Sequence, residues 1–395
     1  MSTKERILVF ILASINFTNI VDFMIMLPLG PSLMRIFKVT DQEFAYVVSA
    51  YAISAFVSGF TAAFFVDNFD RKKLLVFAYS GFIIGTFACG IAPNYTLLLL
   101  ARMVAGLFGG LIGAQILSIL ADSFPIERRG MAMGFLMAAF SVASVIGVPL
   151  SIYLASEYNW HMPFTAISAL GLVILGFVIK YIPSMTGHIE KVKHKNKFDV
   201  VTRIFKDKNQ VNALLFSFTL MFSHFAVISF MSPYMVKNVG FSEKELAYIY
   251  LFGGGVTIFT APLIGKLSDR YGKYKIFSIF AVMAVIPLIV LTNLGQTSMA
   301  TALLFTSCFF IISGGRIIPS QALISAVVDP QHRGSFMSVN SSIQQLATGS
   351  AAFVTGLVVY TDAQHHFHHF NYIGYGSAFL SIVCIVIGRK LTIKS

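Results

Sequence analysis

The residue with the clearest capacity for chemistry is a carboxylate inside a long apolar stretch. Asp22 lies within an almost uninterrupted apolar run that covers residues 7–37. An acid in the hydrocarbon of a membrane costs about 2.5–3.5 kcal/mol on insertion scales, so such acids have a partner or a function. Asn16 and Asn19 precede Asp22 at three-residue spacing and share one helical face with it. We therefore expect Asn16, Asn19 and Asp22 to face a cavity.

Arg102 is the candidate partner of Asp22. If residues 7–36 cross a bilayer outward, Asp22 lies about 22 Å from the inner face at the usual helical rise. If residues 96–121 cross inward, Arg102 lies about 10 Å from the outer face, which is the same depth. The pair could carry a proton between two faces of the membrane, or it could be a static ion pair that holds two helices together. The sequence leaves both interpretations open.

Other polar residues lie within apolar runs. His224 is either a core histidine or part of a proton relay with Asp22. Arg316 could bind an anionic group of a substrate, or its side chain could extend towards the cytoplasm. Three further residues are cavity candidates on polarity alone: Tyr51, Gln115 and Gln321.

Four histidines follow Asp362 in the segment 361–371: His365, His366, His368 and His369. Imidazoles at this density can bind zinc, nickel or copper. No cysteine and no fixed helical spacing supports a closed site here, so the sequence favours a polar loop and predicts no metal site.

The composition indicates a polytopic membrane protein. Of 395 residues, 56% are hydrophobic and 12% are charged, whereas a soluble domain carries about 25% charged residues. Twelve apolar runs are long enough to span a bilayer, which predicts an all-α membrane protein with twelve transmembrane helices. The runs cover residues 7–36, 44–66, 74–92, 96–121, 132–156, 162–182, 211–236, 245–266, 276–294, 298–326, 335–360 and 372–388.

The positions of the basic residues predict the orientation. With both termini in the cytoplasm, all but six of the 29 Lys and Arg lie on the cytoplasmic side. The exceptions are Arg35, Lys38, Lys237 and Lys244 on the outer side and Arg102 and Arg316 within spans. Topology and anionic membrane lipid thus account for the net charge of +12, and no nucleic-acid partner is required.

The chain repeats internally. The connection 63–73 corresponds to 265–275, and 121–130 corresponds to 326–334, each at an offset of just over 200 residues. This repeat predicts two pseudo-symmetric six-helix halves related by an axis along the membrane normal. The expected division is 1–182, a basic cytoplasmic linker at 183–210, and 211–395.

These connections resemble a signature of the major facilitator superfamily, and the resemblance covers the whole chain. The second copy has Gly265, Asp269, Arg270, Gly272 and Lys273 in the family's order, whereas the first keeps Asp67, Arg71 and Lys72. The resemblance implies the major facilitator fold and a cytoplasmic gate. Its expected residues are Asp67, Arg71 and Asp122 in the first half and Asp269, Arg270 and Asp329 in the second.

Two spans resemble particular members of that family. ARMVAGLFGGLIGAQ (101–115) resembles the family's fourth helix, and its glycines at 106, 109, 110 and 113 have the spacing of close helix packing. In span 5, Ser151 stands where drug antiporters usually have another glycine. The resemblance is therefore to bacterial efflux permeases of the drug:proton antiporter group, with sugar and metabolite exporters nearer than typical drug antiporters.

Taken together, these features predict a secondary active transporter rather than an enzyme. We expect alternating access with proton-coupled export of a small organic molecule: a drug, a sugar or a metabolite. The proton gradient would supply the energy, and no cofactor is required. A proton-driven importer and a non-transporting sensor on the same fold stay as alternatives. The expected location is the bacterial cytoplasmic membrane, and nothing requires more than a monomer.

Overall fold

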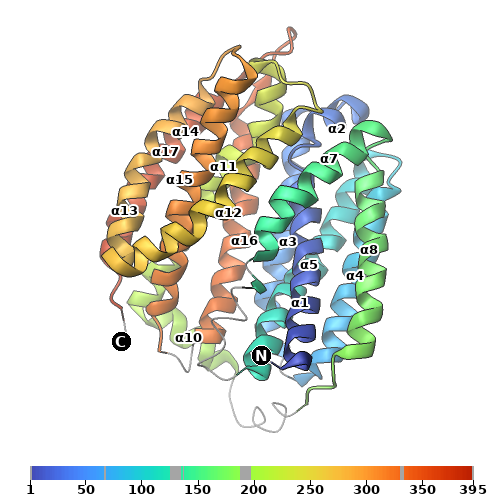
Figure 1. Cartoon of the computed structure of the whole chain (residues 1–395), viewed down its shortest axis with the longest axis vertical. Helices are drawn as coiled ribbons and strands as arrows, with labels where there is room; N and C mark the ends of the chain where they lie inside the picture. The colour runs from blue at the N-terminus through green and yellow to red at the C-terminus, as the bar shows by residue number, and fades with distance from the viewer. Residues whose placement is uncertain are drawn as a thin grey trace.

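A computed structural model describes residues 2–65, 68–124, 135–136, 138–186, 197–329 and 333–393. The chain is almost entirely helical (Figure 1). The first part contains α1 (Thr3–Ile25), α2 (Gly30–Phe37), α3 (Asp41–Phe65), α4 (Arg71–Gly90), α5 (Tyr95–Ser123), the π-helix η2 (Ala143–Gly147), α7 (Val148–Glu157) and α8 (Met162–Tyr181). The second part contains α10 (Lys197–Lys206), α11 (Lys208–Tyr234), η3 (Met235–Val239), α12 (Leu246–Tyr271), α13 (Lys273–Met283), α14 (Val285–Thr292), α15 (Met299–Ala326), α16 (Arg333–Val358), β1 (Tyr360–Thr361), β2 (Phe367–His368) and α17 (Phe370–Arg389).

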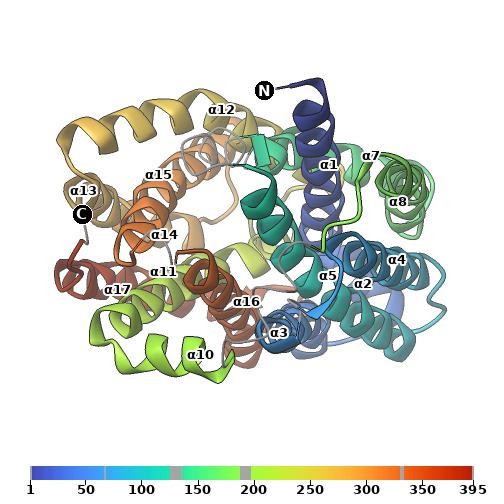
Figure 2. The same ribbon diagram turned by 90° about the horizontal axis from the view of Figure 1, so that it is seen from below.

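The predicted all-α membrane fold is confirmed. Within the described residues, eleven helical segments are long and apolar enough to cross a membrane. The remaining predicted span, 335–360, forms α16, which has 26 residues. Serine, asparagine, glutamine and threonine recur along α16 and lower its hydropathy. It packs along α3 on one side and α11 on the other, so much of its surface is protected from lipid (Figure 2).

The two parts of the chain lie side by side. Helices α1 to α8 occupy one side of the molecule and α11 to α17 occupy the other (Figure 1). Both termini and α10 lie at the same end, where most basic residues are also found. We call this end the inner end and the opposite one the outer end. The exact division at 183–210 stays a prediction, and residues 187–196 lie outside the described residues.

Prolines interrupt two of the predicted spans. The predicted span 7–36 is divided, since the structure ends α1 at Ile25 and begins the short helix α2 at Gly30, with Pro28 in the turn between them and Pro31 in the first turn of α2. The predicted span 276–294 is divided into α13 and α14 because Pro287 has no N–H to donate to Met283, four residues earlier.

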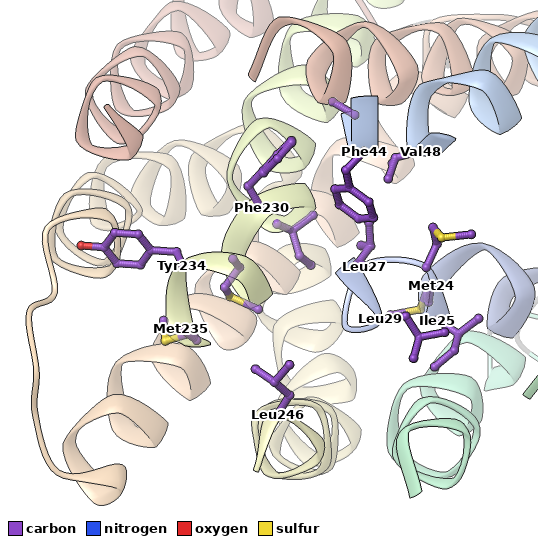
Figure 3. Packing of buried hydrophobic residues seen from close by; sticks show 14 of the residues in the cluster. Met24, Ile25, Leu27, Leu29, Phe44, Val48, Phe230, Tyr234, Met235 and Leu246 are labelled. Carbon is purple, nitrogen blue, oxygen red and sulfur yellow. The ribbon is translucent and has the colours of Figure 1, made fainter. Parts of the chain in front are cut away.

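At the outer end, the apolar core is continuous across both parts of the chain. There, one cluster joins Met24 and Leu27 near the end of α1 to Phe230 of α11 and Leu246 of α12 (Figure 3). Across the interface, the rings of Phe44 and Phe230 meet edge to face, with centroids 5.8 Å apart.

Towards the inner end the buried apolar residues form two clusters. One contains residues of the first part of the chain only, and the other contains fully buried residues of the second part, with Phe60 packed against it. The described structure is thus closed at the outer end, while each part has its own core at the inner end.

Glycines set the close approach of α5 to α3. A Cβ on Gly106 or Gly110 would lie 2.2 Å from the carbonyl oxygen of Tyr51 or Ala55, and one on Gly109 would lie 2.5 Å from the Tyr51 hydroxyl. Gly113 is different, because a Cβ there would meet nothing within 4 Å. The predicted packing role therefore applies to three of the four glycines.

Gly110→Ala should destabilise the protein because the added methyl group must displace the backbone of α3. We expect a loss of about 1–3 kcal/mol, the usual cost of overpacking. Gly113→Ala on the same helix is the matched control, and it should be neutral or stabilising by up to about 1 kcal/mol. Thermal unfolding of both variants in detergent measures the difference. Equal melting temperatures would show that the contact between α3 and α5 is not tightly packed.

Candidate functional site

The structure brings Asp22 and Arg102 together. Nη1 of Arg102 lies 2.8 Å from Oδ2 of Asp22 and donates to its backbone oxygen at 3.2 Å. Both side chains are 0% exposed. The other carboxylate oxygen, Oδ1 of Asp22, has no hydrogen-bond partner among the described residues. The carboxylate thus has one oxygen in the ion pair and one oxygen able to accept a proton.

Aromatic and amide groups surround this pair. The guanidinium of Arg102 lies over the Tyr51 ring, 4.3 Å from its centroid, in cation–π geometry. Asn19 donates to the Tyr51 hydroxyl at 3.2 Å. Two of the predicted cavity residues, Tyr51 and Asn19, therefore support the Asp22–Arg102 pair from α3 and α1.

The other polar candidates lie apart from this group. Asn16 donates to the carbonyl of Leu136 at 3.2 Å, so it contacts the segment before η2. Gln115 is fully buried in α5, and neither of its amide atoms has a hydrogen-bond partner in the described part of the chain. Gln321 is half-buried in α15. The cavity roles of these residues stay predictions.

His224 faces away from Asp22. Its ring stacks on Phe309 of α15, with centroids 5.6 Å apart and the planes 9° from parallel. The neighbouring residues, Phe23 and Phe225, meet across the interface between α1 and α11 at 5.9 Å. No hydrogen bond joins His224 to Asp22 among the described residues. A direct relay between them is therefore not formed in this state, because each side chain turns into its own part of the molecule.

Arg316 is completely buried, with 0% of its surface exposed. Its Nη1 donates to the Ser381 hydroxyl of α17 at 3.2 Å, and Ser381 in turn donates to the carbonyl of Ala281 in α13. The side chain thus points into the second part of the molecule. Of the two predicted alternatives, extension towards the cytoplasm is not what this structure shows.

Two of the residues predicted for the inner gate are in contact within the first half of the chain, and their gating role stays a prediction. Nε of Arg71 lies 3.0 Å from Oδ2 of Asp122, which links the start of α4 to the end of α5. Asp67 lies outside the described residues. In the second half, Asp269 and Arg270 are exposed near the end of α12, and Arg270 lies over the ring of Tyr271. Within the described ranges, no ion pair joins Arg270 to Asp329.

Asp70 has a structural function that the sequence did not suggest. It caps α4 by accepting from the Lys72 N–H, and it also accepts from the Ser184 hydroxyl and the Met185 N–H. Although partial burial opposes the effect, these hydrogen bonds lower the pKa of Asp70 below its usual value. Asp70 therefore anchors the segment after α8 to the start of α4.

Three ion pairs at the outer end join the two parts of the chain, and we call them the outer latch. Arg35 lies 2.7 Å from Glu243, Lys244 lies 2.6 Å from Glu157, and Lys237 lies 3.1 Å from Asp41. These pairs were not predicted from the sequence. The charge pattern did mark one partner of each pair, since Arg35, Lys237 and Lys244 are three of the four basic residues predicted on the outer side.

The Lys237 pair is the least exposed part of the outer latch, with side chains 18% and 6% exposed. Thr361 of β1 completes it by accepting from Lys237 and donating to Asp41, both at 2.6 Å. Asn238 exchanges two hydrogen bonds with the backbone of Phe367 in β2. The small hairpin of β1 and β2 is therefore docked on η3, which continues α11 at the outer end, and on the start of α3.

The histidines of this hairpin lie around Asp362. Within the described residues, which include 361–371, no group of three metal-ligating side chains is close enough to hold a metal ion. His368 Nε2 lies 2.6 Å from Oδ2 of Asp362. This hydrogen bond lowers the pKa of Asp362. The loop is organised by Asp362 within the hairpin.

A family model described as Major Facilitator Superfamily matches residues 12–352. The chain belongs to the major facilitator superfamily. This result confirms the resemblance that the connections and the fourth span indicated.

Individual members of the superfamily match over most of their length. "Uncharacterized MFS-type transporter YceJ" of Bacillus subtilis is 23% identical over 89% of each chain. "Multidrug resistance protein 2" of the same organism is also 23% identical, over 87% of this chain and 86% of its own. The solved structure of a D-xylose-proton symporter superposes with a TM-score of 0.79 at 15% identity, covering 98% of this chain and 97% of that one. The protein is a multi-pass transporter of the bacterial cytoplasmic membrane.

Lys237→Met should weaken the closed outer end of this major facilitator protein. The substitution removes the ammonium group that is bound by Asp41 and Thr361. We expect this loss to destabilise the closed state by about 1 kcal/mol. Lys38→Met is the matched control, since Lys38 is exposed and forms no ion pair among the described residues. Electron paramagnetic resonance distances between labels at Tyr158 and Tyr372, which are exposed near the outer end, should broaden towards longer values in the first variant only. Unchanged distances in both variants would contradict a gating role for this pair.

Proposed function

We propose that the protein is a proton-coupled transporter that exports a small organic molecule by alternating access. The observation that carries this proposal is the fully buried Asp22–Arg102 ion pair. A buried ion pair is a weak source of stability, because the cost of removing two charges from water can exceed their attraction. A pair that opens when the acid takes up a proton provides a means of coupling.

Protonation would act on the contact that joins α1 and α5. With the carboxylate neutral, Arg102 loses its charge partner and keeps the Tyr51 ring and the backbone oxygen of Asp22. The guanidinium is then available for a different partner, and the packing of α1 on α5 changes. The protonated and deprotonated forms would favour different states of the transporter, which is the differential interaction that a conformational switch requires.

The two ends of the molecule supply the gates for this cycle. The outer latch, with the apolar cluster beneath it, holds the described state closed to the outside. The Arg71–Asp122 pair lies at the inner end. In the proposed cycle the outer latch opens while inner contacts form, with the protein acting as a monomer in anionic lipid.

A ligand screen followed by a flux measurement tests this function. Metabolites, drugs and lysolipids are first screened for thermal stabilisation of the purified protein at pH 6 and pH 8. Compounds that stabilise are then added to proteoliposomes that contain a trapped pH-sensitive dye. We expect compound-dependent proton movement, and its direction relative to the compound distinguishes export from import. A compound that crosses at the same rate with and without a pH gradient would contradict proton coupling.

A further inference from the structure

Acidic residues are absent from the membrane core in the second part of the chain. After residue 206, each acid lies at a helix end or in a connection: Asp207, Glu243, Glu245, Asp269, Asp329 and Asp362. Arg316 lies ten residues before the end of α15, about 15 Å from the inner end of that helix. The chain therefore places no carboxylate at the level of Arg316 in this part of the molecule.

The two buried arginines differ in how their charge is balanced. Arg102 has the carboxylate of Asp22 at 2.8 Å. Arg316 has one partner, the Ser381 hydroxyl, which is neutral. No ion pair to Arg316 occurs within the described residues. A buried guanidinium without a counter-charge is costly, since the low-dielectric interior does not replace its hydration.

Two nitrogen atoms on one side of the Arg316 guanidinium have no hydrogen-bond partner among the described residues, and we call this side the free edge. Nη1 is engaged by Ser381, while Nε and Nη2 have no hydrogen-bond partner among the described residues. Nε–H and the adjacent Nη2–H point in the same direction along one side of the planar guanidinium. Such an edge matches the two oxygens of a carboxylate, which is the bidentate geometry that arginine favours.

Further unpaired polar atoms lie along the same face. Phe309, Ser313 and Arg316 follow one another at four- and three-residue spacing, so they share one face of α15. The Ser313 hydroxyl and Nδ1 of His224 are buried without a hydrogen-bond partner in the described structure. The His224 ring stacks on Phe309. The face of α15 that carries Arg316 therefore also carries an unpaired hydroxyl and an aromatic ring, with the His224 ring stacked on that aromatic ring.

The positions of Asp22 and His224 sharpen the contrast between the two halves. They are 202 residues apart, the same offset as between Asp67 and Asp269. The first half thus has an acid where the second half has a histidine. The first half neutralises its buried arginine internally, and the second half does not.

We infer that Arg316, with His224 and Ser313 beside it, is the binding site for the acidic group of the transported molecule, and that this molecule is a small monocarboxylate. One guanidinium balances one negative charge, so a second carboxylate on the ligand would be left unpaired. The rings of Phe309 and Phe225 beside His224 suit an apolar chain. This inference rests on the proposed transport function and names the substrate class for it.

The direct test compares an acid with its amide. Hexanoate and hexanamide have the same shape, but only hexanoate carries a charge at neutral pH. We expect hexanoate to raise the melting temperature of the full-length protein in detergent and to bind in calorimetry, and hexanamide to do neither. This comparison needs no variant. Equal effects of the two compounds, or no binding of hexanoate, would overturn the inference.

Variants then locate the site. Arg316→Gln should weaken hexanoate binding by about tenfold or more, as expected for the loss of a charge-assisted bidentate contact. Arg316→Lys should lie between it and the unmodified protein, because lysine keeps the charge but not the free edge. Arg389→Gln, an exposed change at the end of α17, is the matched control. Unchanged hexanoate binding in Arg316→Gln would place the acid elsewhere and contradict the inference.

Failure of this inference can be separated from failure of the proposed function. Asp22→Asn should keep hexanoate binding and lose proton-driven flux. If that variant keeps its proton-driven flux, the coupling proposal fails and the anion site stands. If a neutral compound is driven by the proton gradient equally well in the unmodified protein and in Arg316→Gln, the anion site fails and the proposed coupling stands.

Discussion

Asp22→Asn should abolish flux driven by a pH gradient and leave exchange of substrate for substrate intact. The amide keeps the size of the side chain but cannot take up or release a proton, so the transporter would alternate without coupling. Because Asp22 is a fully buried acid within α1, we expect gradient-driven flux to fall to the level seen without a gradient. Proteoliposomes with and without an imposed pH difference provide the measurement.

The matched control for this variant is Asp362→Asn. It makes the same chemical change in the outer hairpin, where Asp362 contacts His368 rather than Arg102. Its flux should stay driven by the gradient. Full gradient-driven flux in Asp22→Asn would exclude this carboxylate as the proton carrier and leave it a structural member of an ion pair.

Arg102→Ala should be strongly destabilising. It leaves the Asp22 carboxylate fully buried and without the guanidinium at 2.8 Å. Removing one partner of a buried pair costs about 3–5 kcal/mol, because the remaining charge is neither hydrated nor paired. The loss should become smaller as the pH is lowered, since a proton can then neutralise the carboxylate. Thermal unfolding in detergent at several pH values measures both effects.

The double variant Asp22→Asn with Arg102→Gln distinguishes the two roles of the pair. Neither side chain is charged, so most of the stability lost in Arg102→Ala should return. If the pair couples protons, the double variant is stable but its flux does not respond to a pH gradient. A stable double variant with normal gradient-driven flux would show that the ion pair serves helix packing alone. An Arg102→Ala protein as stable as the original would contradict the electrostatic argument itself.

The contact between Asp22 and Arg102 shows which features of a buried ion pair can be predicted from the sequence. Both residues interrupt apolar runs, and the constant rise of a helix places them at one depth. The depth of a residue in the membrane does not say in which direction its side chain points around the helix axis. The structure supplies that direction. Asp22 turns towards α5, while His224, also in an apolar run, turns towards Phe309. Of the two interpretations of His224, the relay would require its side chain to turn towards Asp22.

The ion pairs of the outer latch could not be predicted from the sequence for a different reason. Positive residues on the outer side departed from the general charge pattern, but the partner of Lys237 lies 196 residues away along the chain and that of Arg35 lies 208 residues away. Nothing local in the sequence relates Lys237 to Asp41. Only the packing of the two halves brings the end of α11 beside the start of α3.

By itself, the sequence determined the membrane class, the approximate spans, the internal repeat and the family, because hydropathy, helical periodicity and motif spacing are local properties. It also marked Asp22, Arg102 and Arg316 as buried charges that needed an explanation. Tertiary structure alone decided which partner each charge has: a carboxylate for Arg102, and a neutral hydroxyl for Arg316. The physical reason is that the partner of a buried charge depends on how helices rotate and pack, and these are set by contacts between residues far apart in the chain.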